Sequence, residues 1–156
     1  MRAVVITVSD RSASGGREDL AGPIAAASLA EAGFACETTI VPDGADSVEG
    51  AVRAALAEGA RLVVTTGGTG IAPRDQTPEG TRRVIDREIP GIAEELRRIG
   101  AAVAPGGLLS RGVAGAAGDA LVVNLAGSPG AVRDGMLLIR RLAPHILDQL
   151  EGSDHA

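Results

Sequence analysis

Short runs of apolar and β-branched residues alternate along this chain with segments of helical pattern, and this alternation restricts the possible folds more than any other feature. Residues 3–8 and 62–66 are continuous runs of Val, Ile, Leu, Ala and Thr, which is the pattern of strands covered on both faces of a sheet. A third strand is predicted over residues 35–41. Strands that alternate with helices in this way predict an α/β fold with a mainly parallel sheet.

The segments between these runs carry helix start and stop signals. Pro23, Asp46, Pro78 and Pro129 stand where helices begin, since Asp favours the cap and Pro favours the first helical position. Helices are predicted over residues 23–32, 46–58, 78–87, 92–99 and 129–150, with residues 9–22 as a long loop and Pro90-Gly91 as a break between two helices.

Two further short strands, residues 113–116 and 121–124, flank the dipeptide Gly118-Asp119. Such a dipeptide between apolar runs indicates a β-hairpin, and a hairpin places an antiparallel edge on the sheet. The full prediction is a three-layer α/β fold, with a mainly parallel mixed sheet and helices on both faces.

Size and composition exclude several classes of protein. The 156 residues fit one domain, assigned to residues 1–150 with a polar tail over 151–156. One Cys and two His exclude a disulfide framework and the usual zinc clusters. The net charge of −5 and the single aromatic residue argue against nucleic acid as a partner. No apolar run is long enough to span a membrane and no secretory signal begins the chain, so a cytoplasmic protein is expected.

The residues most suited to ligand binding or catalysis follow the four predicted parallel strands. They are the segments Ser9-Asp10-Arg11, Pro42-Asp43-Gly44, Thr66-Gly67-Gly68-Thr69-Gly70 and Asn124-Leu125-Ala126-Gly127-Ser128. In open α/β sheets, ligands bind outside the carboxyl ends of the strands. We therefore expect the four segments to meet at one edge and to form the site.

The glycine-rich segment after the third strand is the strongest single signal. Three glycines in four positions allow consecutive N–H groups to face one point, which suits phosphate or pyrophosphate. The segment is not a Walker A loop, because all fifteen basic residues of the chain are Arg. It is not the dinucleotide fingerprint either, because Pro73 stands where the third glycine belongs. A flexible turn without a ligand is the alternative.

Asp43 and Asp75 are the second signal, since each follows a Pro-containing turn beside the expected phosphate site. Two carboxylates there suit a hydrated Mg²⁺ shared with substrate phosphates. Either residue alone also fits a turn former. Ser9-Asp10-Arg11 supplies a hydroxyl, a carboxylate and a bidentate phosphate binder, or else an ordinary loop with a solvated ion pair. Arg97-Arg98 fits a solvated helix face.

Characteristic motifs follow one another in order over nearly the whole chain. They are Ser9-Asp10-Arg11, Gly15, Asp19, Gly22-Pro23, Pro42-Asp43, Thr66-Gly67-Gly68-Thr69-Gly70, Pro73, Asp75-Gln76-Thr77-Pro78-Glu79, Ile89-Pro90-Gly91, Leu109-Ser110-Arg111 and Asn124-Leu125-Ala126-Gly127-Ser128-Pro129-Gly130. Together these motifs resemble the molybdenum cofactor biosynthesis Mog/MoaB family.

This resemblance implies a molybdopterin adenylyltransferase, with Mg²⁺ as cofactor and ATP as co-substrate. It implies that Asp43 and Asp75 are the catalytic and metal-organising pair, and it implies a homotrimer that works with a molybdenum-insertion enzyme. The residues expected to bind phosphate, nucleotide or pterin are Ser9, Asp10, Arg11, Thr66, Gly67, Gly68, Thr69, Gly70, Ser110, Asn124, Gly127 and Ser128. A catalytically silent molybdopterin-binding or scaffolding paralogue of the same fold is the alternative.

Overall fold

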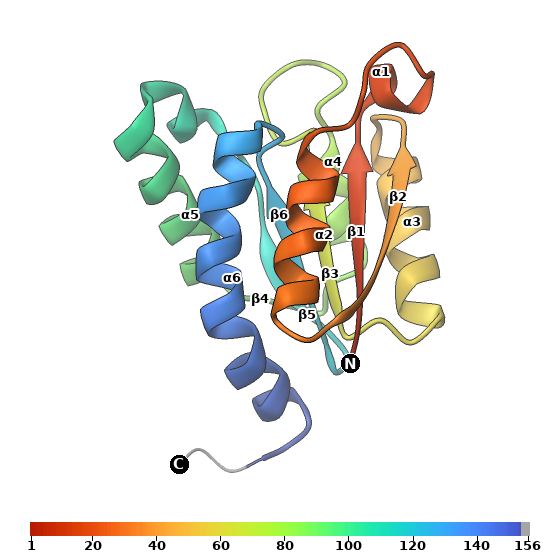
Figure 1. Ribbon diagram of the computed structural model, residues 1–156, viewed down its shortest axis with the longest axis vertical. Helices are drawn as coiled ribbons and strands as arrows, with labels where there is room; N and C mark the ends of the chain where they lie inside the picture. Colours follow the sequence, from red (N-terminus) through yellow and green to blue (C-terminus); the bar gives the residue numbers. More distant parts are fainter. Residues whose placement is uncertain (154–156) are drawn as a thin grey trace.

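A six-stranded sheet in the order β2-β1-β3-β6-β5-β4 runs through the computed structural model, which describes residues 1–153 (Figure 1). The first four strands of that order are parallel, and β5 and β4 add an antiparallel edge. The predicted fold class is confirmed. The strands are β1 (Arg2–Val8), β2 (Ala35–Val41), β3 (Leu62–Thr66), β4 (Arg87–Glu88), β5 (Ala114–Ala117) and β6 (Ala120–Leu125).

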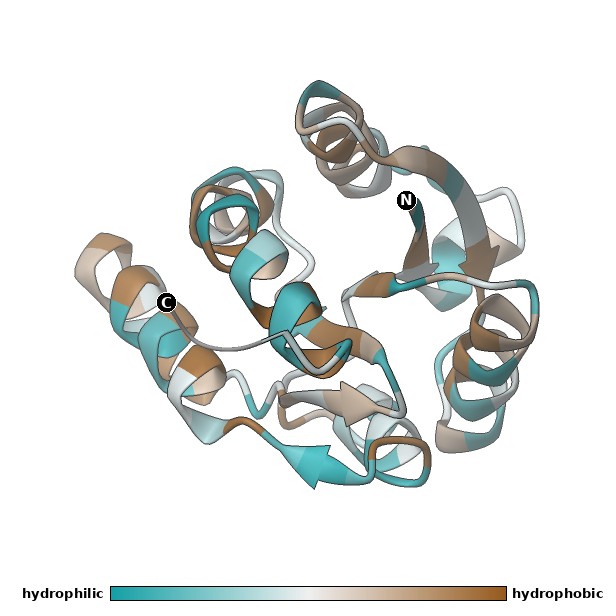
Figure 2. Ribbon diagram, turned by 90° about the horizontal axis from the view of Figure 1, so that it is seen from below, coloured by the Kyte–Doolittle hydropathy of each residue, from teal (hydrophilic) through white to brown (hydrophobic). Residues whose placement is uncertain are grey.

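Helices cover both faces of this sheet (Figure 1, Figure 2). Helices α2 and α6 pack on one face and α3 packs on the other. No helix within residues 1–153 is both long and apolar enough to cross a membrane. The helices are α1 (Asp10–Ala13), α2 (Ala21–Glu31), α3 (Ala45–Ala57), α4 (Thr77–Arg82), α5 (Pro90–Val103), the 3₁₀ helix η1 (Pro105–Leu109) and α6 (Pro129–Leu150).

The side chains of the central strands alternate between two apolar clusters, as strand geometry requires. In β1, Ala3 and Val5 face α2 and α6, whereas Val4 and Ile6 face α3. Strand β3 is buried at every position. This double coverage explains why the continuous apolar runs identified these strands correctly.

The region between α4 and α5 differs from the prediction. Helix α4 ends at Arg82 rather than residue 87, and Arg87–Glu88 pairs with β5 as strand β4. Pro90 does not break a helix: it occupies the first turn of α5, which continues to Val103. Because proline is equally suited to ending one helix and starting the next, the sequence alone did not separate these cases.

The ends of the chain and the first loop need smaller corrections. The loop predicted over residues 9–22 contains α1, and α2 begins at Ala21. The predicted hairpin turn is confirmed, with Gly118 at φ +59°. Of the predicted polar tail, residues 154–156 lie outside the described residues.

A buried asparagine connects the middle of the sheet to α4. The Asn124 side-chain amide donates to Thr65 Oγ1 and to Thr81 Oγ1, both at 2.9 Å. Its Oδ1 accepts the Val113 N–H at 3.1 Å. The Asn124 side chain, predicted to bind a ligand, is thus fully engaged in joining β3, β6 and α4.

We expect Asn124→Ala to destabilise the fold by about 1–3 kcal/mol, because Thr65, Thr81 and the Val113 N–H lose a buried partner. Urea unfolding followed by circular dichroism measures this loss. Thr38→Ala, on the exposed strand β2, is the control and changes stability by less than about 0.5 kcal/mol. Equal stability of the two variants contradicts the structural role of Asn124.

Candidate functional site

The four predicted segments meet at the carboxyl edge of the parallel strands, the upper end of the molecule in Figure 1. A polar cavity of about 540 Å³ opens between them. The predicted residues that line it are Ser9, Asp10, Arg11, Asp43, Thr66, Gly67, Gly68, Asp75, Gly127 and Ser128. Its lining also includes Arg17, Glu18 and Asp19, which sequence reasoning did not assign to ligand binding.

The floor of this cavity consists of closely packed backbone. Gly67 has φ +91°, and a side chain there would overlap the carbonyl oxygen of Val8. A Cβ on Gly127 would lie 3.1 Å from the Gly67 Cα. The Gly67 N–H also donates to Leu125 O at 3.0 Å. The loops after β1, β3 and β6 therefore touch without side chains between them.

Gly68 holds the turn of the glycine-rich loop. Its φ of +67° lies in the left-handed region, and a Cβ there would overlap Thr77 Oγ1 and lie 3.1 Å from Asp43 Oδ1. Thr77 fastens the loop further, because its hydroxyl donates to Gly67 O at 2.9 Å and its N–H donates to Gly68 O at 3.0 Å. These two hydrogen bonds and the positive φ of Gly68 define the shape of the loop.

Asp43 and Asp10 are joined by reciprocal hydrogen bonds between adjacent loops. The Asp10 N–H donates to Asp43 Oδ2 at 3.0 Å, and the Asp43 N–H donates to Asp10 Oδ1 at 3.1 Å. Asp43 Oδ1 faces Gly68, and no residue within 1–153 donates a hydrogen bond to it. One oxygen of Asp43 is thus held by protein while the other is available.

Burial, together with the neighbouring charges, makes the ionised form of Asp43 less favourable than in water. Burial raises the pKa of its carboxyl, and the negative charges of Asp10 and Asp75 act in the same direction. The hydrogen bond from the Asp10 N–H and the charge of Arg74 oppose this increase. A cation placed between Asp43 and Asp75 offsets their repulsion.

Asp75 lies beside Gly70 of the glycine-rich loop and lines the same cavity as Asp43. Its Oδ2 accepts the Ala72 N–H at 3.1 Å, and a Cβ on Gly70 would lie 2.8 Å from this same oxygen. Gly70 therefore leaves the space that the carboxylate occupies, although it does not line the cavity itself. Thr69 is buried beneath the loop, and its carbonyl accepts the Arg111 N–H at 2.7 Å.

Two arginines to which sequence reasoning assigned no role donate hydrogen bonds around this loop. Arg111 donates from Nε to Gly70 O at 2.8 Å and from its terminal nitrogen to Asp75 O at 2.7 Å, and it pairs with Glu79. Arg74 forms a bidentate pair with Asp10, which holds the pKa of the Asp10 carboxyl below its usual value. In the sequence, Arg111 belongs to a motif and Arg74 stands between two motif residues, but the sequence does not show their partners.

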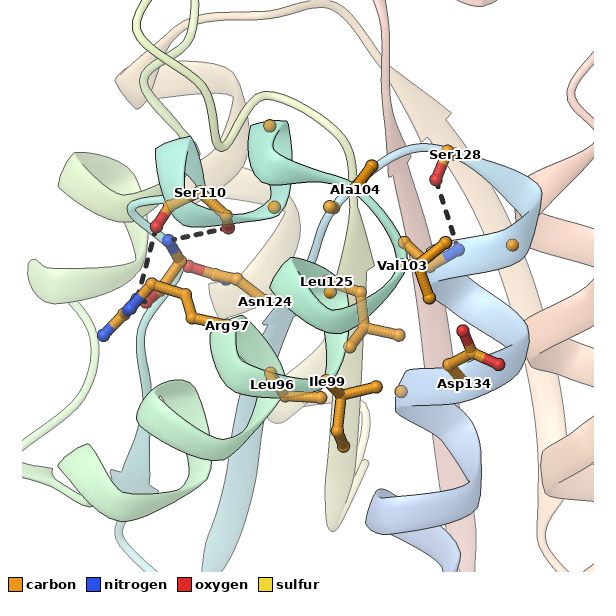
Figure 3. A pocket seen from close by; sticks show the side chains of 18 of the residues that line it. Leu96, Arg97, Ile99, Val103, Ala104, Ser110, Asn124, Leu125, Ser128 and Asp134 are labelled. Carbon is orange, nitrogen blue, oxygen red and sulfur yellow. Dashed lines mark hydrogen bonds between the residues drawn. The ribbon is translucent and has the colours of Figure 1, made fainter.

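A second, more apolar cavity of about 360 Å³ adjoins the first (Figure 3). Leu96, Ile99 and Val103 of α5 and Leu125 of β6 line it. Ser128 borders both cavities.

The predicted residues Ser110 and Asn124 contact this second cavity rather than the first. Arg97, interpreted from sequence as part of a solvated helix face, instead donates to Ser110 O at 3.4 Å and Gly112 O at 3.0 Å. The helix α5 and the segment after η1 are connected by this guanidinium, beside the apolar cavity.

The carboxylates suit one kind of metal site. Within residues 1–153, no group of three or more His, Cys, Asp or Glu side chains is arranged to enclose a metal ion. Asp43 and Asp75 alone match the way proteins hold hydrated Mg²⁺, with one or two carboxylates and substrate phosphates as the remaining ligands. The donor set fits a shared Mg²⁺.

The class of protein that these features define is an α/β domain with a two-carboxylate, glycine-floored candidate site at the carboxyl edge of its sheet. Residues 4–145 match the family model MoCF_biosynth, described as "Probable molybdopterin binding domain". The chain belongs to this family.

Similar proteins carry matching names. The chain is 39% identical over 154 residues, 98% of its length, to the "Molybdenum cofactor biosynthesis bifunctional protein" of Synechococcus elongatus. It is 38% identical over 134 residues to the "Molybdopterin adenylyltransferase" of Haemophilus influenzae, covering 83% of this chain and 68% of that one. The chain spans about half the length of the first two curated relatives, 48% and 50%.

Solved structures agree. The molybdopterin biosynthesis Mog protein from Mycobacterium ulcerans superposes with a TM-score of 0.91 at 46% identity, covering 96% of this chain and 98% of that chain. The resemblance found from sequence motifs is therefore confirmed at the level of family and fold.

We expect Gly68→Ala and Gly70→Ala to differ in their effects. Gly68→Ala loses about 1–2 kcal/mol, because a left-handed backbone disfavours a side chain. Gly70→Ala keeps its stability within about 0.5 kcal/mol, since only the end of the Asp75 side chain must turn aside. Urea unfolding measures the first effect, and a crystal structure of Gly70→Ala measures the second. Gly50→Ala, which meets open space on α3, is the control, and an unmoved Asp75 contradicts the assigned role of Gly70.

Proposed function

We propose that this chain is a molybdopterin adenylyltransferase. It transfers the adenylyl group of ATP to the terminal phosphate of molybdopterin and releases pyrophosphate. A phosphate oxygen of the pterin bonds to the α-phosphorus as the bond from that phosphorus to the bridging oxygen breaks. The observation that carries the proposal is the pair of carboxylates, Asp43 and Asp75, facing a rigid glycine-rich loop in one polar cavity. The names of the adenylyltransferase relatives support it.

This reaction needs no nucleophilic side chain from the protein. No Cys, His or Lys lines the polar cavity, and none is needed because the substrate phosphate is the nucleophile. The protein must align that phosphate with the α-phosphate and offset the charge that develops. The fixed backbone floor at Gly67 and Gly127 provides a surface on which phosphates can be aligned.

Asp43 and Asp75 are the residues that would hold Mg²⁺ in this proposal. When bound, Mg²⁺ neutralises phosphate charge and withdraws electrons from the α-phosphate. Asp43 would hold the ion through its carboxylate, whose Oδ2 also accepts the Asp10 N–H. Asp75 is fixed through its Oδ2 by Ala72.

The two cavities suit the two parts of the ligands. The polar cavity takes phosphates, and the apolar cavity beside it has the size and lining for a flat heterocycle. Ser128, at the start of α6, lies where the two meet. Exposed Val103, Leu108, Leu109 and Leu137 support the homotrimer implied by family resemblance. In this proposal a molybdenum-insertion enzyme consumes the product, and the need for ATP supports a cytoplasmic location.

The competing function is a catalytically silent molybdopterin-binding or scaffolding module. Incubation of the purified protein with molybdopterin and Mg-ATP separates the two. Adenylylated pterin and an equal amount of pyrophosphate are expected from the enzyme. Binding of molybdopterin without either product assigns the chain to the silent module.

We expect Asp43→Asn and Asp75→Asn each to lower turnover about 10²–10³-fold, the usual effect of removing an electrostatic contribution to the transition state. The amide keeps the size of the side chain but loses the charge that attracts Mg²⁺. Turnover at saturating Mg-ATP and molybdopterin affinity are both measured. Molybdopterin binding changes little, and near-normal turnover in both variants contradicts the catalytic assignment.

Arg11 and Arg17 are expected to bind the phosphates of ATP. Both line the polar cavity, and neither guanidinium has a protein partner within residues 1–153. We expect Arg11→Ala and Arg17→Ala each to raise the KM for ATP about tenfold, since a charge-assisted hydrogen bond is lost. Steady-state kinetics measures this. Arg141→Ala is the control, because Arg141 is also exposed and has no partner among residues 1–153, but lies far along α6. Equal effects of all three changes point to general charge rather than binding.

A further inference from the structure

Arg74 connects the three loops that carry the candidate catalytic residues. Its Nε donates to Asp10 Oδ2 at 3.0 Å, and one terminal nitrogen donates to Asp10 Oδ1 at 2.9 Å and to Asp43 O at 3.0 Å. Arg74 itself directly precedes Asp75 in the glycine-rich loop. One guanidinium therefore joins the loops after β1, β2 and β3.

Asp10 transmits this connection to Asp43. Its Oδ1 accepts both the Arg74 terminal nitrogen and the Asp43 N–H, and its own N–H holds Asp43 Oδ2. Arg74 donates to both oxygens of Asp10, so this carboxylate is engaged with the protein through each of them. Its geometry is that of a support for Asp43.

We propose that Arg74 and Asp10 form a clamp that positions the Asp43 carboxylate for metal-dependent adenylyl transfer. This inference rests on the proposed function. Arg74 and Asp10 are positioning residues: they fix Asp43 Oδ2 and the Asp43 backbone, so that Oδ1 faces Gly68. Supporting residues of this kind typically change metal affinity or activity about 10- to 100-fold when they are removed.

A purely structural ion pair does not account for this arrangement. The Arg74 and Asp10 side chains are 64% and 45% exposed, and exposed pairs contribute little to stability. Arg98 forms a similar bidentate pair with Glu95, but within α5 and away from the site. The distinguishing features of Arg74 are its third bond, to Asp43 O, and its partner's bonds to Asp43.

The test compares Arg74→Ala in the wild-type and in the Asp43→Asn backgrounds. In the wild-type background we expect kcat to fall about 10- to 100-fold, with the KM for molybdopterin and the melting temperature nearly unchanged. In the Asp43→Asn background the same change costs less than about twofold, because its effect acts through Asp43. An equal loss in both backgrounds overturns the proposal, as does an unchanged kcat.

Two more variants distinguish positioning of Asp43 from a general effect of charge. Arg74→Lys keeps the charge but not the bidentate geometry, so it restores only part of kcat; full restoration overturns positioning in favour of charge alone. Arg98→Ala is the matched control and leaves kcat unchanged. If Arg74→Ala fails to fold, Asp10→Asn takes its place in the same comparison, and failure of both to fold overturns the proposal.

Binding of Mn²⁺ in the presence of a non-reacting ATP analogue separates this inference from the proposed function. The electron paramagnetic resonance signal of free Mn²⁺ reports affinity without turnover. We expect Arg74→Ala to weaken Mn²⁺ binding about tenfold and to have no further effect in Asp43→Asn. A wild-type protein that binds Mn²⁺ in this clamp-dependent way but makes no adenylylated pterin retains the clamp and contradicts the adenylyltransferase assignment. If Mn²⁺ binding does not depend on Arg74 and turnover is normal, the clamp is overturned and the adenylyltransferase assignment is retained.

Discussion

The site depends first on the hydrogen bonds of one buried side chain. Asn124 of β6 donates to Thr65, near the end of β3, and to Thr81, in the helix α4 that follows the glycine-rich loop. The strand before the loop, β3, and the helix after it, α4, are therefore both hydrogen-bonded to the same side-chain amide. A buried amide with all its bonds satisfied specifies one arrangement, because any displacement leaves a polar group without a partner. The hydrogen bonds of Asn124 therefore fix the elements that flank the glycine-rich loop.

The carboxylates of the polar cavity differ in whether the protein gives them hydrogen-bond partners. The polar cavity has more carboxylates than cations among its nearest residues, including Asp10, Asp19, Asp43 and Asp75. Arg74 satisfies Asp10, while Thr7 and the Gly22 N–H satisfy Asp19. Asp43 and Asp75 each keep an oxygen to which no residue within 1–153 donates, and Glu18 also lines the cavity. Negative charge is thereby concentrated at two points facing one loop, an arrangement that suits a shared cation.

The sequence was sufficient for the parts of the fold and site that local pattern determines. Strands β1 and β3 were correctly predicted because they are buried on both faces, and parallel pairing alone brought Asp43 and the glycine-rich loop to one edge. Strand β4 was missed because its two residues are exposed and carry no apolar pattern. The partners of Arg74 and Arg111 were missed because they lie 64 and 41 residues away. For Asn124, the motif identified the residue but not its hydrogen-bond partners. Only the fold shows that its side-chain amide is bonded within the protein.

The backbone contact among Val8, Gly67 and Gly127 has a consequence for how such a protein can diversify. Peptide groups are the same whatever the side chains, so substitutions elsewhere leave the chemical surface of the cavity floor unaltered. Differences in ligand preference must then reside in the walls, where Arg17 and Glu18 project from the segment between α1 and α2. One fold can therefore keep the same backbone surface for phosphate while substitutions in the cavity walls change which ligand is preferred.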